Sequence, residues 1–211
     1  MERLLLFGAA SSVYNGPSNN FETEEGHVME RIWNKVRFRI KEIACIGNYG
    51  LVVLSDEGGS RDVPIFLPCE AAGEVSLLMN GSDDANAGNE FLLVRGLTAA
   101  FGIIVEEVVI TRVERGQYVA EAVFNECGRT EMVTVSVKEA LLLTLDMRCP
   151  LFIEAELLEQ QTMDGGDGIW STPLNVLPEE MLQKMLDRAV EDEEYKLAQI
   201  FSEEIKRRHT G

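Results

Sequence analysis

Apolar and polar residues in the middle of the chain follow two different periods. Alternation and short apolar runs, typical of β-strands, occur at 36–45, 51–54, 63–67, 105–113, 118–124, 132–135 and 151–153. Between these runs, apolar residues recur three and four positions apart, which predicts α-helices at 70–80, 90–101 and 138–147, and a helical turn through 157–158. Strand runs joined by short turns and interrupted by helices predict an α+β domain, with an antiparallel or mixed sheet and packed helices.

The C-terminal part of the chain carries a second apolar pattern, which predicts two short helices folded back on each other. Each segment has one apolar stripe at helical spacing, made by Leu182, Met185, Leu186, Ala189 and Val190 and by Leu197, Ala198, Phe201 and Ile205. Pro178 suits a helix start, and the basic residues 206–208 complement the dipole at a helix end. Neither stripe can be buried within a single helix, so we expect an α-helical hairpin.

These patterns divide the chain into four parts. We expect a poorly ordered leader at 1–35, the α+β domain at 36–160, a linker at 161–177 and the hairpin at 178–211. No apolar run approaches the roughly 20 residues that cross a bilayer, so we expect a cytoplasmic protein without a membrane segment. Whether Met1 or Met29 is the biological start stays open.

The formal net charge is −17, from 36 acidic and 19 basic residues. A field of this sign repels phosphate backbones and therefore disfavours tight nonspecific binding of nucleic acid. One local exception is a run of basic residues around the first predicted strand, made by Arg31, Lys35, Arg37, Arg39 and Lys41. The last three alternate with apolar residues, so the run is either a basic patch or an ordinary solvated strand face.

Cysteine and histidine usage narrows the chemistry of the main domain. The four cysteines lie far apart in the sequence without the short spacing of a metal or redox motif, and we expect buried, reduced thiols at Cys45, Cys69, Cys127 and Cys149. The two histidines, His27 and His209, lie near the termini. A zinc site or a serine triad in the main domain is thereby disfavoured, and chemistry there must rest on carboxylates, hydroxyls, lysine or arginine.

The predicted hairpin resembles the UVR motif of excision-repair proteins. The matching positions are Ala189, Glu193, Tyr195, Ala198, Phe201, Glu204 and Ile205, whereas Ser202 stands where many members have arginine. The resemblance implies a docking element for a protein partner, with contacts through Tyr195, Ala198, Phe201 and Ile205. The alternative is an ordinary hairpin that packs on its own domain.

Residues 36–160 resemble the bifunctional nuclease domain of bacteria and plants. The resemblance is carried by the order of the predicted elements and by short motifs at 63–66, 70–71, 105–110, 140–143 and 149–153. It implies an α+β fold that tends to form homo-oligomers and to cleave DNA or RNA. In some bacterial lineages a UVR motif follows this domain, so the two resemblances support each other.

The polar positions of that family are replaced in this chain. Glu90-Phe91-Leu92 stands where members usually have Thr-His-Asp, and 135–139 reads Val-Ser-Val-Lys-Glu where they have Ser-Arg-x-Ser-Asp. The resemblance then implies a site in which Glu70 and Glu139, helped by Glu90, hold Mg²⁺ or Mn²⁺. Lys138 or Arg95 would neutralise charge on the phosphoryl group. All three glutamates also lie near predicted helix starts, where the dipole alone favours them.

Two functions therefore stay open. The first is metal-assisted phosphodiester hydrolysis in the main domain. The second is a noncatalytic oligomeric scaffold, whose hairpin recruits a partner through an apolar face ringed by the acidic run 191–194 around Tyr195. Such a ring suits a basic partner, because charge mainly sets encounter rate and specificity. The enzyme requires the glutamates to converge in one cleft, whereas the scaffold requires exposed apolar side chains on the hairpin.

Overall fold

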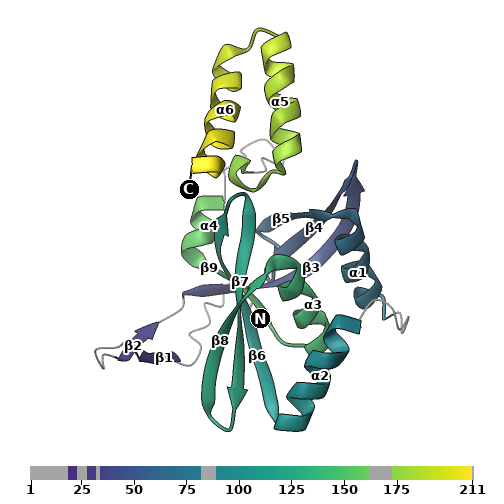
Figure 1. Ribbon diagram of the computed structural model, residues 1–211, viewed down its shortest axis with the longest axis vertical. Helices are drawn as coiled ribbons and strands as arrows, with labels where there is room; N and C mark the ends of the chain where they lie inside the picture. The colour runs from purple at the N-terminus through teal and green to yellow at the C-terminus, as the bar shows by residue number, and fades with distance from the viewer. Residues whose placement is uncertain (1–18, 23–27, 32–33, 82–88, 162–172, 211) are drawn as a thin grey trace, which may run out of the picture.

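The computed structural model describes residues 19–22, 28–31, 34–81, 89–161 and 173–210, and its main element is a seven-stranded mixed sheet (Figure 1). The strands are β3 (Lys35–Ile46), β4 (Tyr49–Asp56), β5 (Asp62–Pro68), β6 (Ile103–Glu114), β7 (Gln117–Glu126), β8 (Arg129–Ser136) and β9 (Leu151–Glu154). Ahead of them, β1 (Asn19–Glu22) and β2 (Val28–Arg31) pair as a separate antiparallel ribbon.

The helices account for the rest of the described chain. They are α1 (Cys69–Met79), α2 (Asn89–Phe101), α3 (Val137–Met147), α4 (Ala155–Gln161), the short 3-10 helix η1 (Leu174–Val176), α5 (Glu179–Glu191) and α6 (Tyr195–Thr210). The predicted α+β class, with a mixed sheet, packed helices and a C-terminal pair of helices, is confirmed. Among the described helices, none is long and apolar enough to cross a membrane.

The sheet joins two antiparallel meanders through its shortest strand. Its order is β5-β4-β3-β9-β6-β7-β8, so β9 lies between strands that are distant in sequence. β9 is antiparallel to β3, with Phe38 opposite Leu151, and parallel to β6, with Val108 opposite Leu151. Pro64 lies in β5 at the sheet edge, where a missing N–H leaves no ladder bond unmade.

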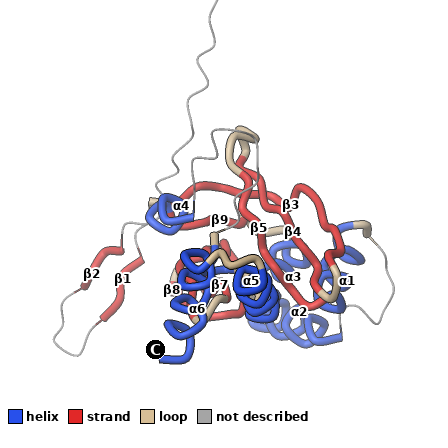
Figure 2. Tube along the Cα trace, turned by 90° about the horizontal axis from the view of Figure 1, so that it is seen from above, coloured by secondary structure: helices blue, strands red, loops and turns tan. Residues whose placement is uncertain are grey.

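One face of the sheet carries the main core. Helices α1 and α3 pack on it, with α2 beside α3 and the start of β6 (Figures 1 and 2). The fully buried residues of this face include Val52, Leu54, Ile65, Val108 and Ile110. Strand alternation delivers these side chains, because every second residue points to the same side.

On the opposite face of the sheet, the first cation of the basic run in β3 forms a buried ion pair. Lys35 is 1% exposed, pairs with Glu107 of β6, and lies over the Phe152 ring with Nζ 4.5 Å from the centroid. Arg37 pairs with Glu57 at 3.2 Å and Lys41 with Asp62 at 2.6 Å. These three cations of β3 are therefore engaged by carboxylates of the same chain.

The predicted hairpin is formed by α5 and α6, which have a small core of their own. Its buried residues are Leu177, Leu182, Ala189, Ala198 and Phe201, against which Phe66 of β5 also packs. Much of the expected leader (1–35) and linker (161–177) lies outside the described residues. Within them the structure describes β1, β2 and the beginning of β3, and in the linker η1 with residues next to it.

Candidate functional site

The first turn of α3 carries two of the predicted site residues, and both have structural partners. Ser136 caps the helix: its Oγ accepts a 3.3 Å bond from the Glu139 N–H, and Glu139 Oε2 accepts a 2.7 Å bond from the Ser136 N–H. This capping box satisfies two N–H groups at the helix start. Lys138, the next residue back, forms a 2.9 Å ion pair with Glu74 of α1.

Helix α1 presents acidic residues toward the same region. Glu70 is exposed in the first turn of α1, and Glu74 follows it by four residues and so shares its side of the helix. The Glu74–Lys138 ion pair joins the middle of α1 to the first turn of α3. Glu70 lies one helical turn before Glu74, in the first turn of α1. Sequence reasoning missed Glu74, although its four-residue spacing from Glu70 could have suggested it.

The predicted Arg95 lies elsewhere. It is on α2 and pairs with Asp146, at the far end of α3, with Nε 2.8 Å from Oδ2 and a second bond from Nη2 to Oδ1. Eight residues separate Lys138 from Asp146, which is about 12 Å along a helix axis. Arg95 is therefore not part of the neighbourhood of Glu139. An acidic residue in the last turn of a helix, opposed by the dipole, was the signal for this missed pair.

The third glutamate can be placed only by its backbone. Glu90 is the second residue of α2, so it lies near a helix start as expected. Within the ranges that the structure describes, no group of three or more His, Cys, Asp or Glu side chains is placed to hold a metal ion.

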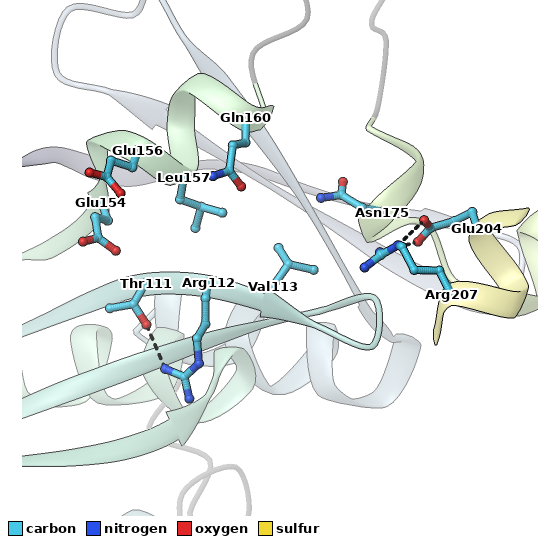
Figure 3. Close-up of a pocket in the computed structure, with 10 residues that line it drawn as sticks. All are labelled: Thr111, Arg112, Val113, Glu154, Glu156, Leu157, Gln160, Asn175, Glu204 and Arg207. Carbon is cyan, nitrogen blue, oxygen red and sulfur yellow. Dashed lines mark hydrogen bonds and ion pairs between the residues drawn. The ribbon is translucent and has the colours of Figure 1, made fainter. Parts of the chain in front are cut away.

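A polar pocket of about 350 Å³ lies on another part of the molecule, between the sheet, α4 and α6 (Figure 3). It is lined by Thr111, Arg112, Val113, Glu154, Glu156, Leu157, Gln160, Asn175, Glu204 and Arg207. Its two arginines are engaged, since Arg112 bonds Thr111 at 3.2 Å and Arg207 bonds Glu204 at 2.8 Å. Among the described lining residues there is none of the predicted catalytic set, and the pocket adds no argument for a phosphate site.

The four residues expected to contact a partner fall into two groups. Tyr195 is 68% exposed, whereas Phe201 is 7% exposed and Ala198 is equally well buried. Ile205 packs against the same hairpin core. Phe201 and its neighbours therefore hold α5 and α6 together, and Tyr195 alone of the four presents a large exposed surface.

Other apolar side chains around the turn between the two helices are exposed. We define the tip patch as Val190, Tyr195, Leu197 and Ile200, all of them exposed. The acidic residues 191–194 fill the connection between α5 and α6 and are exposed as well. The sequence pattern had assigned Val190 and Leu197 to the buried stripes, so this part of the prediction was wrong. Each lies one position from the buried Ala189 or Ala198, and only one residue of each pair faces the partner helix.

A buried arginine joins the end of α6 to the segment that precedes α5. Arg208 of α6 donates to the Leu177 carbonyl at 2.7 Å, to the Leu174 carbonyl at 2.8 Å and to Glu204 at 2.9 Å. Near the start of α5, burial raises the pKa of Tyr49 of β4, and the negative charge of Glu180 and hydrogen bonding to it raise it further. Arg208 and Glu180 lie at the ends of α6 and α5 that are far from the turn between these helices, so the tip patch lies away from both.

The cysteines are less buried than expected. Cys45 and Cys127 are exposed, Cys69 is half-buried, and all four thiols are free. Only Cys149 matches the expectation, and burial raises its pKa to about 11. The expectation was wrong for Cys45 and Cys127 because both lie beside tight turns at strand ends, where neighbouring apolar residues do not imply a core position.

Comparison with known proteins agrees with the fold. A family model of the bifunctional nuclease domain matches residues 52–165, which span β4 to α4 and include every predicted catalytic residue. No curated protein matches the chain. The matched region begins within β4 and ends before α5, so it covers six of the seven strands of the sheet and the helices α1 to α4, and neither β3 nor the hairpin. Because the match covers more than half of the 211 residues of the chain, the chain belongs to the bifunctional nuclease domain family.

Proposed function

We propose that this member of the family is an oligomeric scaffold that recruits a basic protein partner through the tip patch of its hairpin. The observation that carries this proposal is the exposure of Val190, Tyr195, Leu197 and Ile200 on a hairpin whose own core is already complete. Folding of this chain leaves these four large side chains in water, and exposed apolar surface often marks interaction sites. The UVR-like sequence of the hairpin supports the same role.

The charge around the patch favours one kind of partner. Four consecutive acidic residues at 191–194 are exposed beside Tyr195, in a chain whose net charge is −17. A partner segment with apolar anchors flanked by lysine or arginine would gain from this field during encounter. Tyrosine is also a common anchor residue at interfaces. We therefore assign to the patch a basic, amphipathic helix of another protein.

A binding experiment tests this assignment. A fluorescent amphipathic helical peptide of leucine and lysine is titrated with wild type and with the Tyr195→Ser/Leu197→Ser/Ile200→Ser variant, which keeps the charge. We expect the variant to bind at least about tenfold more weakly, as for loss of anchor residues. Leu97→Ser on α2 is the control and should bind as wild type does. Equal binding by the triple variant would reject the tip patch as the docking site.

A second apolar surface supports self-association. On α2, Leu93, Leu97 and Phe101 follow one another at four-residue spacing, and with Ile104 they are all exposed. Between 91 and 104 the sequence has one charged residue, Arg95, which Asp146 neutralises. A second copy of this acidic chain can therefore approach this surface with little charge repulsion. Such a small contact is below the roughly 1,200 Å² of stable interfaces, so we expect a weak dimer.

Sedimentation equilibrium at high protein concentration tests the dimer. Leu97→Gln should shift the protein toward monomer, because it places an amide in the centre of the contact. Leu197→Gln is a matched control, since Leu97 is 47% and Leu197 43% exposed. A monomeric wild type, or equal effects of the two substitutions, would contradict self-association through α2.

Metal-assisted phosphodiester hydrolysis is the second candidate function. The family to which the chain belongs supports it, and so does the packing of α1 against α3, since Glu70 and Glu139 lie in the first turns of these two helices. These two carboxylates would hold Mg²⁺ or Mn²⁺, which would activate water for attack on the phosphate. Lys138 would then leave Glu74 to neutralise phosphoryl charge. The opposing evidence is that Glu139 and Lys138 already have structural partners.

Calorimetric titration with Mn²⁺ separates this candidate from the scaffold. A metal site requires binding that is weakened in Glu70→Gln and Glu139→Gln. Glu139→Gln is informative because glutamine keeps the capping box. Glu203→Gln, on the exposed side of α6, is the control. If none of the substitutions changes Mn²⁺ binding, these glutamates do not form the site.

A further inference from the structure

The turn between β3 and β4 brings two cysteines together that are far apart in the sequence. Cys45, near the end of β3, pairs directly with Gly50 of β4. Directly paired residues of an antiparallel ladder point to the same face of the sheet. Gly50 faces α1, because a Cβ added to this glycine would overlap Ala72 of α1 and would stand 3.9 Å from the Cα of Cys69. Cys45 therefore projects on the α1 side of the sheet, next to Cys69.

The side chain of Cys69 turns toward the same place. Cys69 is the first residue of α1, and its Sγ lies 3.8 Å from the Gly47 carbonyl oxygen in the turn after Cys45. Burial, the negative charge of Cys45 and a hydrogen bond with the Cys45 thiol raise the pKa of Cys69. The two sulfur atoms are thus neighbours across a glycine that lacks a side chain to separate them. Cys45 is exposed and Cys69 half-buried, so a small oxidant can reach them.

We propose that Cys45 and Cys69 are a reversible redox pair, which closes into an intramolecular disulfide by exchange with a small-molecule disulfide of the glutathione class. The exposed Cys45 thiolate attacks one sulfur of the oxidant, forms a mixed disulfide and releases one thiolate. Cys69 then loses its proton and attacks the Cys45 sulfur, which releases the second thiol. Two protein thiols are oxidised to one disulfide, and one small-molecule disulfide is reduced to two thiols.

Closure of this pair would act on a sensitive part of the molecule. The bond would tie the β3–β4 turn to the first turn of α1, where Glu70 follows Cys69 directly. Tyr49, next to the turn, has its pKa raised by burial and by Glu180 near the start of α5. The disulfide therefore restrains the helix start that carries a predicted carboxylate, beside a strand residue that lies near the hairpin. This inference does not depend on whether the protein is a scaffold or a nuclease.

Equilibration in mixtures of reduced and oxidised glutathione, followed by acid quench, alkylation and peptide mass mapping, tests the pair. We expect a Cys45–Cys69 linked peptide that is two hydrogen atoms lighter than the reduced pair, while Cys127 and Cys149 remain free for alkylation after unfolding. Amide exchange in the β3–β4 turn and in the first turn of α1 should slow in the oxidised protein. Failure to form this linked peptide in the folded protein would overturn the proposal.

Three variants make the test specific. Cys45→Ser should lose the linked peptide without gaining a stable adduct on the less accessible Cys69, whereas Cys69→Ser should accumulate a glutathione adduct on Cys45 that no neighbour resolves. Cys127→Ser removes another exposed thiol beside a strand turn and should behave as wild type. If the linked peptide forms equally well in urea, the folded structure does not create the pair, and the proposal fails.

Discussion

Gly116, in the turn between β6 and β7, lies directly against the guanidinium group of Arg208 on α6. A Cβ on this glycine would stand 2.5 Å from Nη1 and 2.6 Å from Cζ of the arginine. Arg208 has little room to yield, because three hydrogen bonds to Leu177, Leu174 and Glu204 fix its position. The contact joins the tip of a sheet hairpin to the last turns of the C-terminal helix, and it explains why the helical hairpin is held on the main domain.

The first prediction concerns this close approach. Gly116→Ala should lower the free energy of unfolding by clearly more than Gly128→Ala, as measured by urea denaturation. Both glycines lie in strand turns at positive φ, +81° and +92°, so both substitutions carry a backbone cost of about 1–2 kcal/mol. Only Gly116 has the arginine within 4 Å, since a Cβ at Gly128 meets nothing. Equal losses would show that the Arg208 contact does not matter.

Removal of the arginine itself should have a larger effect. Arg208→Met leaves the Leu174 and Leu177 carbonyls and Glu204 without their buried donor, and we expect a loss of about 2–4 kcal/mol in unfolding free energy. Amide exchange of α5 and α6 should rise more than that of the sheet. Arg188→Met is the control, because Arg188 is exposed and pairs weakly with Asp192 at 3.6 Å. We expect Arg188→Met to change the free energy of unfolding by no more than about 0.5 kcal/mol.

The buried ion pair on the second face of the sheet gives a further test. Lys35→Met should cost about 3–5 kcal/mol, because it leaves Glu107 buried without its cation. Adding Glu107→Leu should restore most of this stability, since two apolar side chains can replace a buried pair. The pair of Lys41 and Asp62 serves as a reference, and Lys41→Met should cost less than Lys35→Met, because the Lys41 side chain is 46% exposed whereas that of Lys35 is 2% exposed. A double variant as unstable as Lys35→Met would contradict this account.

Acid should weaken the docking of the hairpin. Hydrogen bonding from Arg207, opposed by burial and supported by Arg208, lowers the pKa of Glu204 below its ordinary value of 4.5. A carboxylate with a lower pKa in the folded state stabilises the fold above its unfolded pKa, and this stabilisation is lost as the pH falls through the folded value. Amide exchange of α6 should therefore rise on acidification below about pH 4.5.

The control for the pH prediction is a pair of neighbouring glutamates. Glu204→Gln should remove part of the acid dependence, because the uncharged amide no longer titrates. Glu203→Gln should keep it, because Glu203 is exposed and bonds only Gln199 among its described partners. An acid response that is the same in all three proteins would exclude Glu204 as its source.

Local sequence patterns predicted most of the helices and strands, but they did not predict which strands pair when these are far apart in the chain. Strand alternation and helical spacing gave the elements from β3 to α4 and the two hairpin helices. The insertion of β9 between β3 and β6 was not predicted, because Leu151 must pair with Phe38 and Val108, which lie far away in the chain. The sequence of a four-residue strand does not indicate which strands it will pair with in the sheet.

The candidate site shows the same limit. Ser136 and Glu139 have the spacing of a capping box, so the structural role of Glu139 could be read from the sequence. The last-turn position of Asp146 indicated that it has a basic partner but did not identify Arg95. The meeting of Cys45 with Cys69 has no local signature, since it joins separate elements. Leu197 is exposed because α6 faces α5 with Ala198. A rotation of the helix by one residue would exchange the two positions, and the sequence pattern does not determine that rotation.

The central claim is that this member of the bifunctional nuclease domain family works through its docking surfaces. It is tested most directly by a cleavage assay on single- and double-stranded DNA and RNA with Mg²⁺ or Mn²⁺, using wild type, Glu70→Gln and Glu139→Gln. The account predicts no metal-dependent cleavage that either substitution removes. Metal-dependent cleavage by wild type that is lost in both variants, with their folds intact, would contradict it and would establish the glutamates as a catalytic site.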